Sequence, residues 1–205
     1  MARILDVGTL DYMAALELQK SALEARIAGE IEDTVIVVDH PPVFTVGRKQ
    51  HSLANVLNPG ETPVVEVDRG GDVTWHGPGQ IVAYPIVKLE GTQRDLHAWL
   101  RTLEEVMIRT VAAFGLHGVR DPRNTGTWVG GRKVGSVGIA CRRWVTWHGL
   151  ALNVNPDLAW FSRIHPCGLD SALLTSMEVA AGRPMDVARV RAVLCDLAAR
   201  LPSLD

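Results

Sequence analysis

The sequence predicts an α+β or mixed α/β domain with many strands and few helices. Short β-branched or aromatic runs recur along the chain and are bounded by Gly, Pro or Asp, as expected of strands. A few longer segments instead repeat their apolar residues at helical spacing. The 205 residues, 47% of them hydrophobic, are enough for one well-formed core. We therefore expect residues 1–205 to form a single domain without an internal repeat or linker.

The first half of the chain predicts one helix followed by several strands. Residues 11–28 place Tyr12, Leu16, Leu23 and Ile27 on one helical face, and Gly29 is a typical stop signal. Behind this helix, alternating or continuous apolar runs between turn residues predict a series of strands. The expected strands are residues 34–39, 43–46, 64–67, 73–75 and 81–89.

The second half adds two helices and three strands. Thr92, followed three residues later by Asp95, resembles a capping box, and an apolar stripe runs from Leu96 to Phe114 before Gly115. Residues 187–201 form a second amphipathic segment at the end of the chain. Further strands are expected at residues 126–129, 133–141 and 144–154.

Charge and cysteine content exclude several classes of protein. The 21 basic and 23 acidic residues give a formal charge of −2, so no global charge favours nucleic acid or an anionic membrane as a partner. No apolar run approaches the length of a membrane span, and residues 1–30 lack the continuous apolar stretch of a signal peptide, so we expect a cytoplasmic protein. Three unpaired-looking cysteines argue against a disulfide framework.

The glycine-rich segment from Arg69 to Gln80 is the most informative part of the chain. It holds four glycines, a proline, an arginine, a threonine and a histidine around only two large apolar residues, Val73 and Trp75. Glycines flanking a short strand are typical of a place where a ligand or a second backbone comes close. A plain turn before a strand is the alternative.

Of the three cysteines, Cys167 is the candidate nucleophile. Cys195 lies in an apolar helix and Cys141 ends a strand, so we interpret both as structural. Cys167 instead lies between Pro166 and Gly168, where a loop can present a thiol near a cation or a helix start and lower its pKa. A half-buried loop cysteine without a catalytic role is the alternative.

A reactive thiol needs a group that activates it, and the sequence offers His165, His148, His76 and Lys133. Lys133 opens a strand in which alternation places it on the face of the apolar residues Val137 and Ile139. A lysine held against an apolar face loses hydration of its charged form and becomes able to accept a proton. Alternatively, Lys133 begins a hairpin after Gly130 and Gly131 and is solvated.

Two other kinds of site are not predicted. The segment from Gly126 to Val134 lacks both the lysine and the Ser/Thr that a phosphate-binding loop requires at its end. The seven histidines show no regular metal-ligand spacing, so we predict neither a metal nor a cofactor.

Four motifs in order closely resemble the lipoyl(octanoyl) transferase family, and the resemblance extends from His40 through Cys167. They are RGGDVTWHGPGQ at 69–80, KVGSVG at 133–138, HGLALN at 148–153 and PCG at 166–168. The resemblance implies a mixed sheet flanked by helices, as in biotin and lipoate protein ligases. Trp75 departs mildly, because other members can carry tyrosine there, and we expect this difference to alter the pocket lining only.

The resemblance also implies an activity, its partners and its site residues. An octanoyl group passes from octanoyl-acyl carrier protein to one lysine of a lipoyl domain, in 2-oxoacid dehydrogenase complexes or in the glycine cleavage H protein. Cys167 matches the nucleophile that forms a thioester, and Lys133 matches the lysine that lowers its pKa and carries the proton. The matching substrate-binding residues are Arg69, Gly70, Gly71, Asp72, Val73, Thr74, Trp75, His76, Ser136, Val137, Gly138, Gly149, Leu150 and Ala151.

Physical chemistry accommodates this activity without ATP, because thioester exchange is nearly isoenergetic and transfer to an amine is downhill. The octanoyl tail needs an apolar tunnel, and backbone amides near Gly168 or at Gly70 and Gly71 are candidate donors to the oxyanion. Two acidic protein substrates would favour a basic rim; its candidates are Arg120, Arg123, Arg132, Arg142 and Arg143. A scattered, solvated set of arginines is the alternative.

Two other functions stay open at this level. An ATP-dependent ligase of the lipoate/biotin type would activate a free acid and tolerate loss of Cys167. A non-catalytic acyl-carrier binding module would keep the apolar pocket but leave the Cys167 thiol unreactive.

Overall fold

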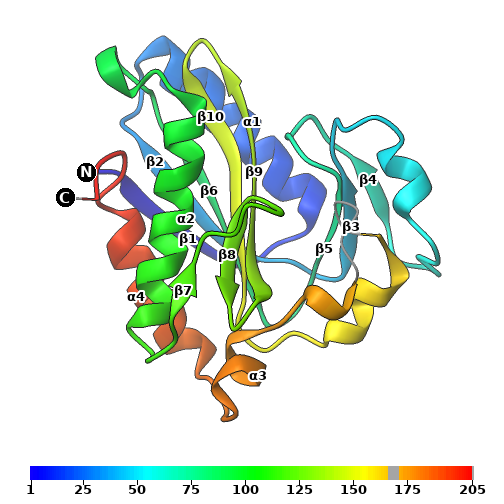
Figure 1. Ribbon diagram of the computed structural model, residues 1–205. Coiled ribbons are helices and arrows are strands. Elements are labelled where there is room, and N and C mark those ends of the chain that lie inside the picture. The colour runs from blue at the N-terminus through cyan, green and yellow to red at the C-terminus, as the bar shows by residue number, and fades with distance from the viewer. Residues whose placement is uncertain (166–170, 205) are drawn as a thin grey trace.

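A mixed sheet of seven strands forms the body of the protein (Figure 1). The fold comes from a computed structural model that describes residues 1–165 and 171–204. Within these residues β1 pairs with β2 in parallel, and every other pairing in the large sheet is antiparallel. In spatial order the strands are β1 (Arg3–Thr9), β2 (Thr34–Asp39), β6 (Gln80–Ile86), β10 (Val145–Asn153), β9 (Arg132–Arg142), β8 (Gly126–Val129) and β7 (Gly118–Val119).

Helices cover both faces of this sheet. Helix α1 (Tyr12–Ala28) packs on one face, against β10 and β6. Helices α2 (Leu96–Ala112) and α4 (Val187–Ala198) pack together on the opposite face, and the short α3 (Met177–Ala181) lies below them (Figure 1). The alternation of each strand explains this arrangement: in β2, Val35 and Val37 belong to the core under α2, whereas Ile36 and Val38 belong to the core under α1.

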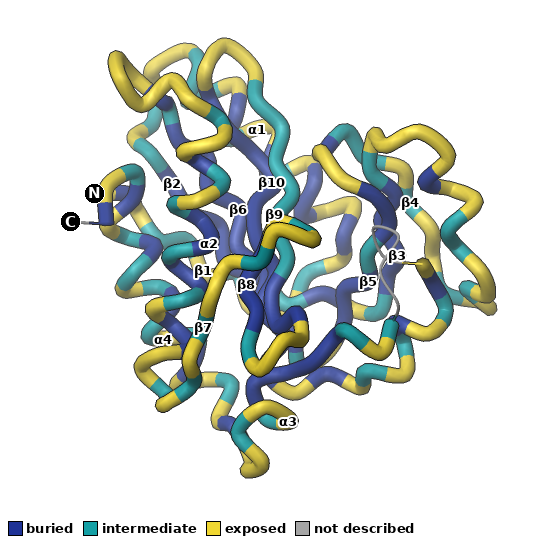
Figure 2. Tube along the Cα trace, in the orientation of Figure 1, coloured by how far each residue is buried: buried dark blue, intermediate teal, exposed yellow. Residues whose placement is uncertain are grey.

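The central strands are buried from end to end. Every residue of β6 and of β10 is buried, because both strands have a neighbour on each side and a helix layer over each face (Figure 2). Burial along the whole strand is typical of strands covered on both faces, and here it includes the polar residues Gln80, His148 and Asn153.

A second sheet of three strands lies beside the first. Its order is β4 (Val64–Glu66), β3 (Val43–Val46) and β5 (Val73–His76), with β3 parallel to β4 and antiparallel to β5. Its separate core centres on Phe44 and Trp75. The Trp75 ring stacks on Trp160 with 5.6 Å between centroids and meets the edge of Phe161, so the 3₁₀ segment Leu158–Arg163 closes this core.

The predicted α+β class, with a mixed sheet flanked by helices, is confirmed, and most elements lie where the sequence predicted them. Residues Gly130 and Gly131 form the two-residue hairpin turn between β8 and β9, both with positive φ. The capping box at Thr92 was wrong: residues 91–93 form a 3₁₀ turn, and Asp95 itself caps α2 by accepting hydrogen bonds from the amides of His97 and Ala98. Strands β1 and β7 were not predicted.

None of the helices among the described residues is long and apolar enough to cross a membrane.

Candidate functional site

A pocket that is partly open to solvent lies between the two sheets. Its walls come from α1, β5, β6, β9 and β10, from the loops before β5 and before β8, and from Phe161 and Leu174. Most of the lining is apolar, including Val82, Val137, Leu150, Ala151 and Leu174. Polar side chains gather at specific points; they are Tyr12, Arg69, Thr74, His76, Tyr84, Asn124, Lys133, Ser136 and His148.

Lys133 is the one lysine that lines this pocket in the described part of the chain. Lys133 is only 4% exposed, so the alternative in which its side chain is solvated is wrong. The backbone of Lys133 forms a parallel bridge with Leu174, and its carbonyl accepts a hydrogen bond of 2.9 Å from the amide of Thr175. The Lys133 ammonium or amine donates a hydrogen bond to Oδ1 of Asn124. The side chain is therefore held at the pocket wall, not spread over the surface.

A chain of hydrogen bonds joins His76 in the pocket lining to Gln80, Asn153 and Thr175. Gln80 donates from Nε2 to Oδ1 of Asn153 at 2.9 Å, which leaves its Oε1 to accept from Nδ1 of His76 at 2.7 Å. Asn153 in turn donates to the carbonyl of Thr175, next to Lys133. Because Nδ1 of His76 carries the proton, its Nε2 accepts, with Oγ1 of Thr45 at 3.5 Å. The His and Gln of the glycine-rich motif thus fix one neutral imidazole tautomer.

A second polar group surrounds Tyr84 at the inner wall. The Tyr84 hydroxyl lies 2.8 Å from Nε2 of His40, whose Nδ1 donates to the carbonyl of Leu10 at 2.8 Å. His148 stacks on Trp147 and places Nε2 2.9 Å from Oδ1 of Asp68. These contacts link the loop before β5 to β10, so side chains from both sheets hold the pocket together.

Most of the predicted substrate-binding residues line the pocket, and three do not. Of the predicted set, Gly70, Asp72 and Trp75 are not in the lining. Asp72 is 1% exposed and accepts hydrogen bonds from Asn55 and from the amide of Val73. Burial raises the pKa of the Asp72 carboxyl, but these hydrogen bonds outweigh burial, so the pKa is lowered. Trp75 points into the core of the small sheet, so it supports the pocket wall instead of lining it.

Gly70 and Gly138 bring the backbones of the two sheets together. The amide of Gly70 donates to the carbonyl of Ile139 at 2.8 Å. A Cβ on Gly138 would lie 3.0 Å from the carbonyl oxygen of Gly70 and 3.2 Å from the Arg69 side chain. A side chain at position 138 would therefore push the glycine-rich loop away from β9.

The predicted nucleophile Cys167 lies outside the described residues, as does the rest of 166–170. On the N-terminal side of that segment, Ile164 forms a bridge with Val56, and the amide of His165 donates to the carbonyl of Asn55. On its C-terminal side, Leu174 lines the pocket and pairs with Lys133.

Sequence reasoning missed several residues of the lining because they come from distant elements. Tyr12 opens α1, Val82 and Tyr84 lie in β6, Asn124 precedes β8, and Phe161 lies in a 3₁₀ segment. His148 was considered as an activator of the thiol and as the first residue of the HGLALN motif, but was not in the predicted substrate-binding set. The spacing of Val82 and Tyr84, two residues apart in a strand, was the signal that they share a face.

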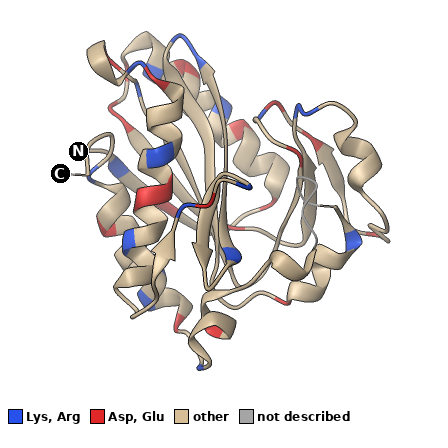
Figure 3. Cartoon of the chain, in the orientation of Figure 1, with Lys and Arg blue, Asp and Glu red and all other residues tan. Residues whose placement is uncertain are grey.

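The expected basic rim is not a continuous patch. Arg120 pairs with Glu104 and Glu105, Arg123 pairs with Asp121, and Arg142 pairs with Glu24. Arg132 and Arg143 have no carboxylate partner among the described residues. Figure 3 shows basic and acidic residues interspersed around the fold, which favours the scattered alternative.

Three buried histidines make the stability of the fold depend on pH. Burial lowers the pKa of His40 and His148, and burial together with the nearby His40 lowers the pKa of His76 to about 3. The unfolded chain therefore binds more protons than the native one below about pH 6.5, so stability is present above that pH and is lost as pH falls. Each such histidine contributes a slope of up to about 1.4 kcal/mol per pH unit.

We expect the urea midpoint to fall steadily between pH 7 and pH 5. Replacing His76 with Asn should flatten this dependence, whereas the same replacement at the exposed His97 should leave its slope unchanged. Equal slopes for wild type and His76→Asn would show that His76 is not held neutral in the native state.

The pocket combines an apolar slot with a buried primary amine, and comparison with known proteins shows the class of protein that has this fold. The lipoate-protein ligase A structure bound with ATP superposes with a TM-score of 0.74 at 14% identity, covering 94% of this chain and 82% of that chain. The Aquifex aeolicus biotin protein ligase superposes with a TM-score of 0.54 at 12% identity, covering 96% of this chain and 67% of that chain. A family model described as the lipoyl protein ligase A/B catalytic domain matches residues 11–198. The chain thus has the catalytic fold of the lipoyl protein ligases.

Within that class the sequence is more specific. An octanoyltransferase from Geobacter metallireducens is 46% identical over 201 residues, covering 98% of this chain and 92% of the relative. The chain belongs to the octanoyltransferase family and is an acyltransferase.

Proposed function

We propose that the protein moves an octanoyl group from octanoyl-acyl carrier protein to the ε-amine of a lysine in a lipoyl domain, through a thioester on Cys167. The observation that carries the proposal is the buried Lys133 at the wall of an apolar pocket, in a chain whose relatives are octanoyltransferases. Residues 1–205 would act as one catalytic domain, in the cytoplasm, with lipoyl domains of 2-oxoacid dehydrogenase complexes or the glycine cleavage H protein as acceptors.

The apolar lining suits the acyl tail. Octanoyl has seven carbons beyond its carbonyl, and each methylene is worth about 0.8 kcal/mol when fully buried. Val82, Leu150 and Ala151 offer such burial along β6 and β10. The tail would therefore bind in the slot, with the carbonyl directed toward Lys133.

In the first half-reaction the Cys167 thiol gives its proton to the Lys133 amine. The thiolate attacks the thioester carbonyl of the donor, a new C–S bond forms, and the carrier thiol leaves with a proton returned from Lys133. One thioester replaces another, so the step is nearly isoenergetic and consumes no ATP.

In the second half-reaction the acceptor lysine attacks the Cys167 thioester. The incoming amine must lose a proton as the C–N bond forms, and Lys133 is the candidate acceptor. The C–S bond then breaks and the proton passes to the leaving Cys167 thiolate. The product is an amide, and the enzyme returns to its starting state.

The proposal is tested by intact-protein mass spectrometry after mixing the protein with octanoyl-acyl carrier protein in the absence of ATP. We expect a mass increase of one octanoyl group that hydroxylamine removes and a lipoyl domain discharges. The Cys141→Ala/Cys195→Ala double variant is the matched control and should form the same adduct. Modification of the lipoyl domain only from free octanoate and ATP would instead identify a ligase, and acyl-carrier binding without any adduct would identify a binding module.

A further inference from the structure

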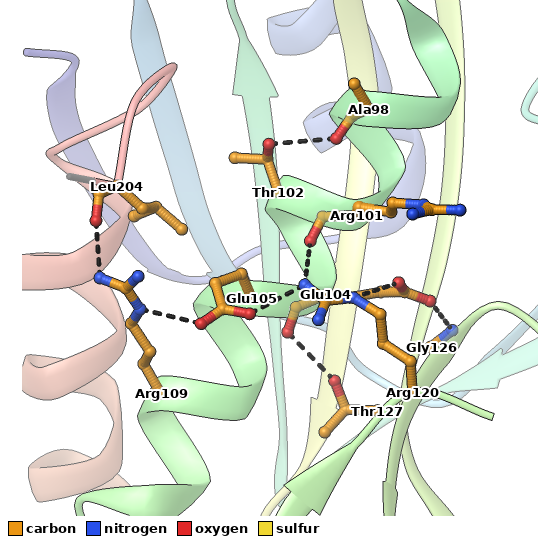
Figure 4. Close-up of polar contacts among 10 residues, drawn as sticks. All are labelled: Ala98, Arg101, Thr102, Glu104, Glu105, Arg109, Arg120, Gly126, Thr127 and Leu204. Carbon is orange, nitrogen blue, oxygen red and sulfur yellow. Dashed lines mark hydrogen bonds and ion pairs between the residues drawn. The ribbon is translucent and has the colours of Figure 1, made fainter.

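A buried carboxylate on α2 fixes the loop that precedes β8. Glu104 is 5% exposed; its Oε1 accepts a hydrogen bond of 2.7 Å from the amide of Gly126, and its Oε2 accepts one of 3.1 Å from Arg120. The carbonyl of Glu104 also accepts from the hydroxyl of Thr127, as Figure 4 shows. These bonds hold both ends of residues 120–127 against α2.

Within that fixed loop, Gly126 leaves room for the Lys133 side chain. A Cβ on Gly126 would lie 2.6 Å from Cε of Lys133 and 2.2 Å from the carbonyl oxygen of Gly135, and its φ of +142° also favours glycine. The aliphatic part of Lys133 therefore passes directly over the Gly126 backbone. Its amine then reaches Asn124, two residues earlier in the same loop.

Asn124 is itself anchored. Its carbonyl oxygen accepts a hydrogen bond of 3.1 Å from Nε1 of Trp128, whose ring is fully buried. Its side chain lines the pocket and accepts from Nζ of Lys133. The carboxamide oxygen of Asn124 that faces the Lys133 amine is therefore held in place by the anchored backbone of this loop.

We propose that Asn124 is a positioning residue that orients the Lys133 amine for proton transfer, an inference that rests on the proposed function. The acceptor that Asn124 offers to the amine is an uncharged carboxamide oxygen. A carboxylate there would favour the ammonium form and weaken Lys133 as a base, whereas a carboxamide holds one N–H without a counter-charge.

Two carboxylates of the described residues lie on or beside this loop, and each is paired with an arginine. Glu104 pairs with Arg120, and Asp121 pairs with Arg123, so these carboxylates are already neutralised. Among the described residues, the other titratable groups in the pocket lining are Tyr12, Arg69, His76, Tyr84 and His148.

The test measures the rate at which iodoacetamide alkylates Cys167 as a function of pH, in a Cys141→Ala/Cys195→Ala background. Lys133→Met should move the midpoint up toward the value of about 8.5 for a free thiol. Asn124→Ala should move it in the same direction and lower the rate at pH 7 about 10-fold or more, the effect of one hydrogen bond to a charged group. In the Lys133→Met variant, Asn124→Ala should have no further effect. Gln93→Ala, an exposed amide on the 3₁₀ turn before α2, is the control.

Turnover of Asn124→Asp supplies a second readout. This variant keeps an acceptor oxygen at nearly the same place but adds a charge, so the acidic limb of kcat/KM should move to higher pH while the plateau stays near wild type. Asn124→Ala should instead lower the plateau. A merely structural role would not separate the two variants in this way.

The outcomes distinguish this proposal from the proposed function. If Lys133→Met shifts the alkylation midpoint and Asn124→Ala does not, the role of Asn124 is refuted and the role of Lys133 stands. An equal effect of Asn124→Ala with and without Lys133 also refutes it, because Asn124 would then act by another route. If Lys133→Met itself leaves the midpoint unchanged, both proposals fail.

Discussion

Replacing Cys167 with serine is expected to lower octanoyl transfer by on the order of 10³-fold or more. The serine hydroxyl has nearly the same shape but is a far weaker nucleophile at neutral pH, because it ionises much less readily than a thiol. No octanoyl adduct should then be detected on the intact protein after incubation with the acylated carrier. The measurement is single-turnover transfer to a lipoyl domain, followed by mass spectrometry.

The two other cysteines provide matched controls for that experiment. Burial raises the pKa of the Cys141 thiol and, with nearby Asp6, the pKa of the Cys195 thiol, so both stay protonated at neutral pH. Cys141→Ser and Cys195→Ser should transfer octanoyl at the wild-type rate. If Cys167→Ser retained wild-type activity, a covalent route through that thiol would be ruled out.

Replacing Lys133 with methionine is expected to lower kcat by about 10²- to 10⁴-fold, the usual contribution of a positioned acid–base group. Methionine keeps an unbranched side chain that can lie over Gly126, so packing changes little. Since the acyl tail does not depend on the amine, KM for the carrier substrate should change much less than kcat. Stopped-flow measurement of acylation, and separately of discharge to a lipoyl domain, would show whether both half-reactions slow.

Arg132→Met is the natural control, because Arg132 is the exposed neighbour at the start of β9. It removes one positive charge from the same hairpin without touching the pocket lining. A fall in kcat shared equally by Arg132→Met and Lys133→Met would attribute the effect to net charge at the hairpin and not to proton transfer.

Local patterns in the sequence were enough to predict the elements with strong signals. The helix expected over residues 11–28 is α1, and Asp11 begins it by accepting from the amides of Met13 and Ala14. Thr92 failed as a cap because Asp95 lies one residue before the helix and reaches the same kind of amides. Strand β1 was missed because its exposed, charge-containing sequence is stabilised chiefly by parallel pairing with β2, a long-range contact.

The candidate site shows the same division between local and long-range information. The glycine-rich motif predicted one wall of the pocket from contiguous residues. Within β5, however, the side chain of Trp75 points into the core of the small sheet, whereas its neighbours Thr74 and His76 line the pocket. Tyr12 and Asn124 come from an early helix and a later loop, and only the folded sheet brings them to the same cavity. Burial of Lys133 likewise depends on Leu174, more than forty residues further along the chain.

The complete burial of β6 and β10 constrains how substrate preference can evolve. The same two strands supply side chains to the pocket and hold the centre of the large sheet, so a substitution that lengthens or shortens the slot also changes the packing under a helix layer. Core substitutions of that kind commonly destabilise a protein by several kcal/mol, a large part of its total stability. Variants accepting other acyl lengths should therefore emerge more readily from a parent that has first been stabilised elsewhere.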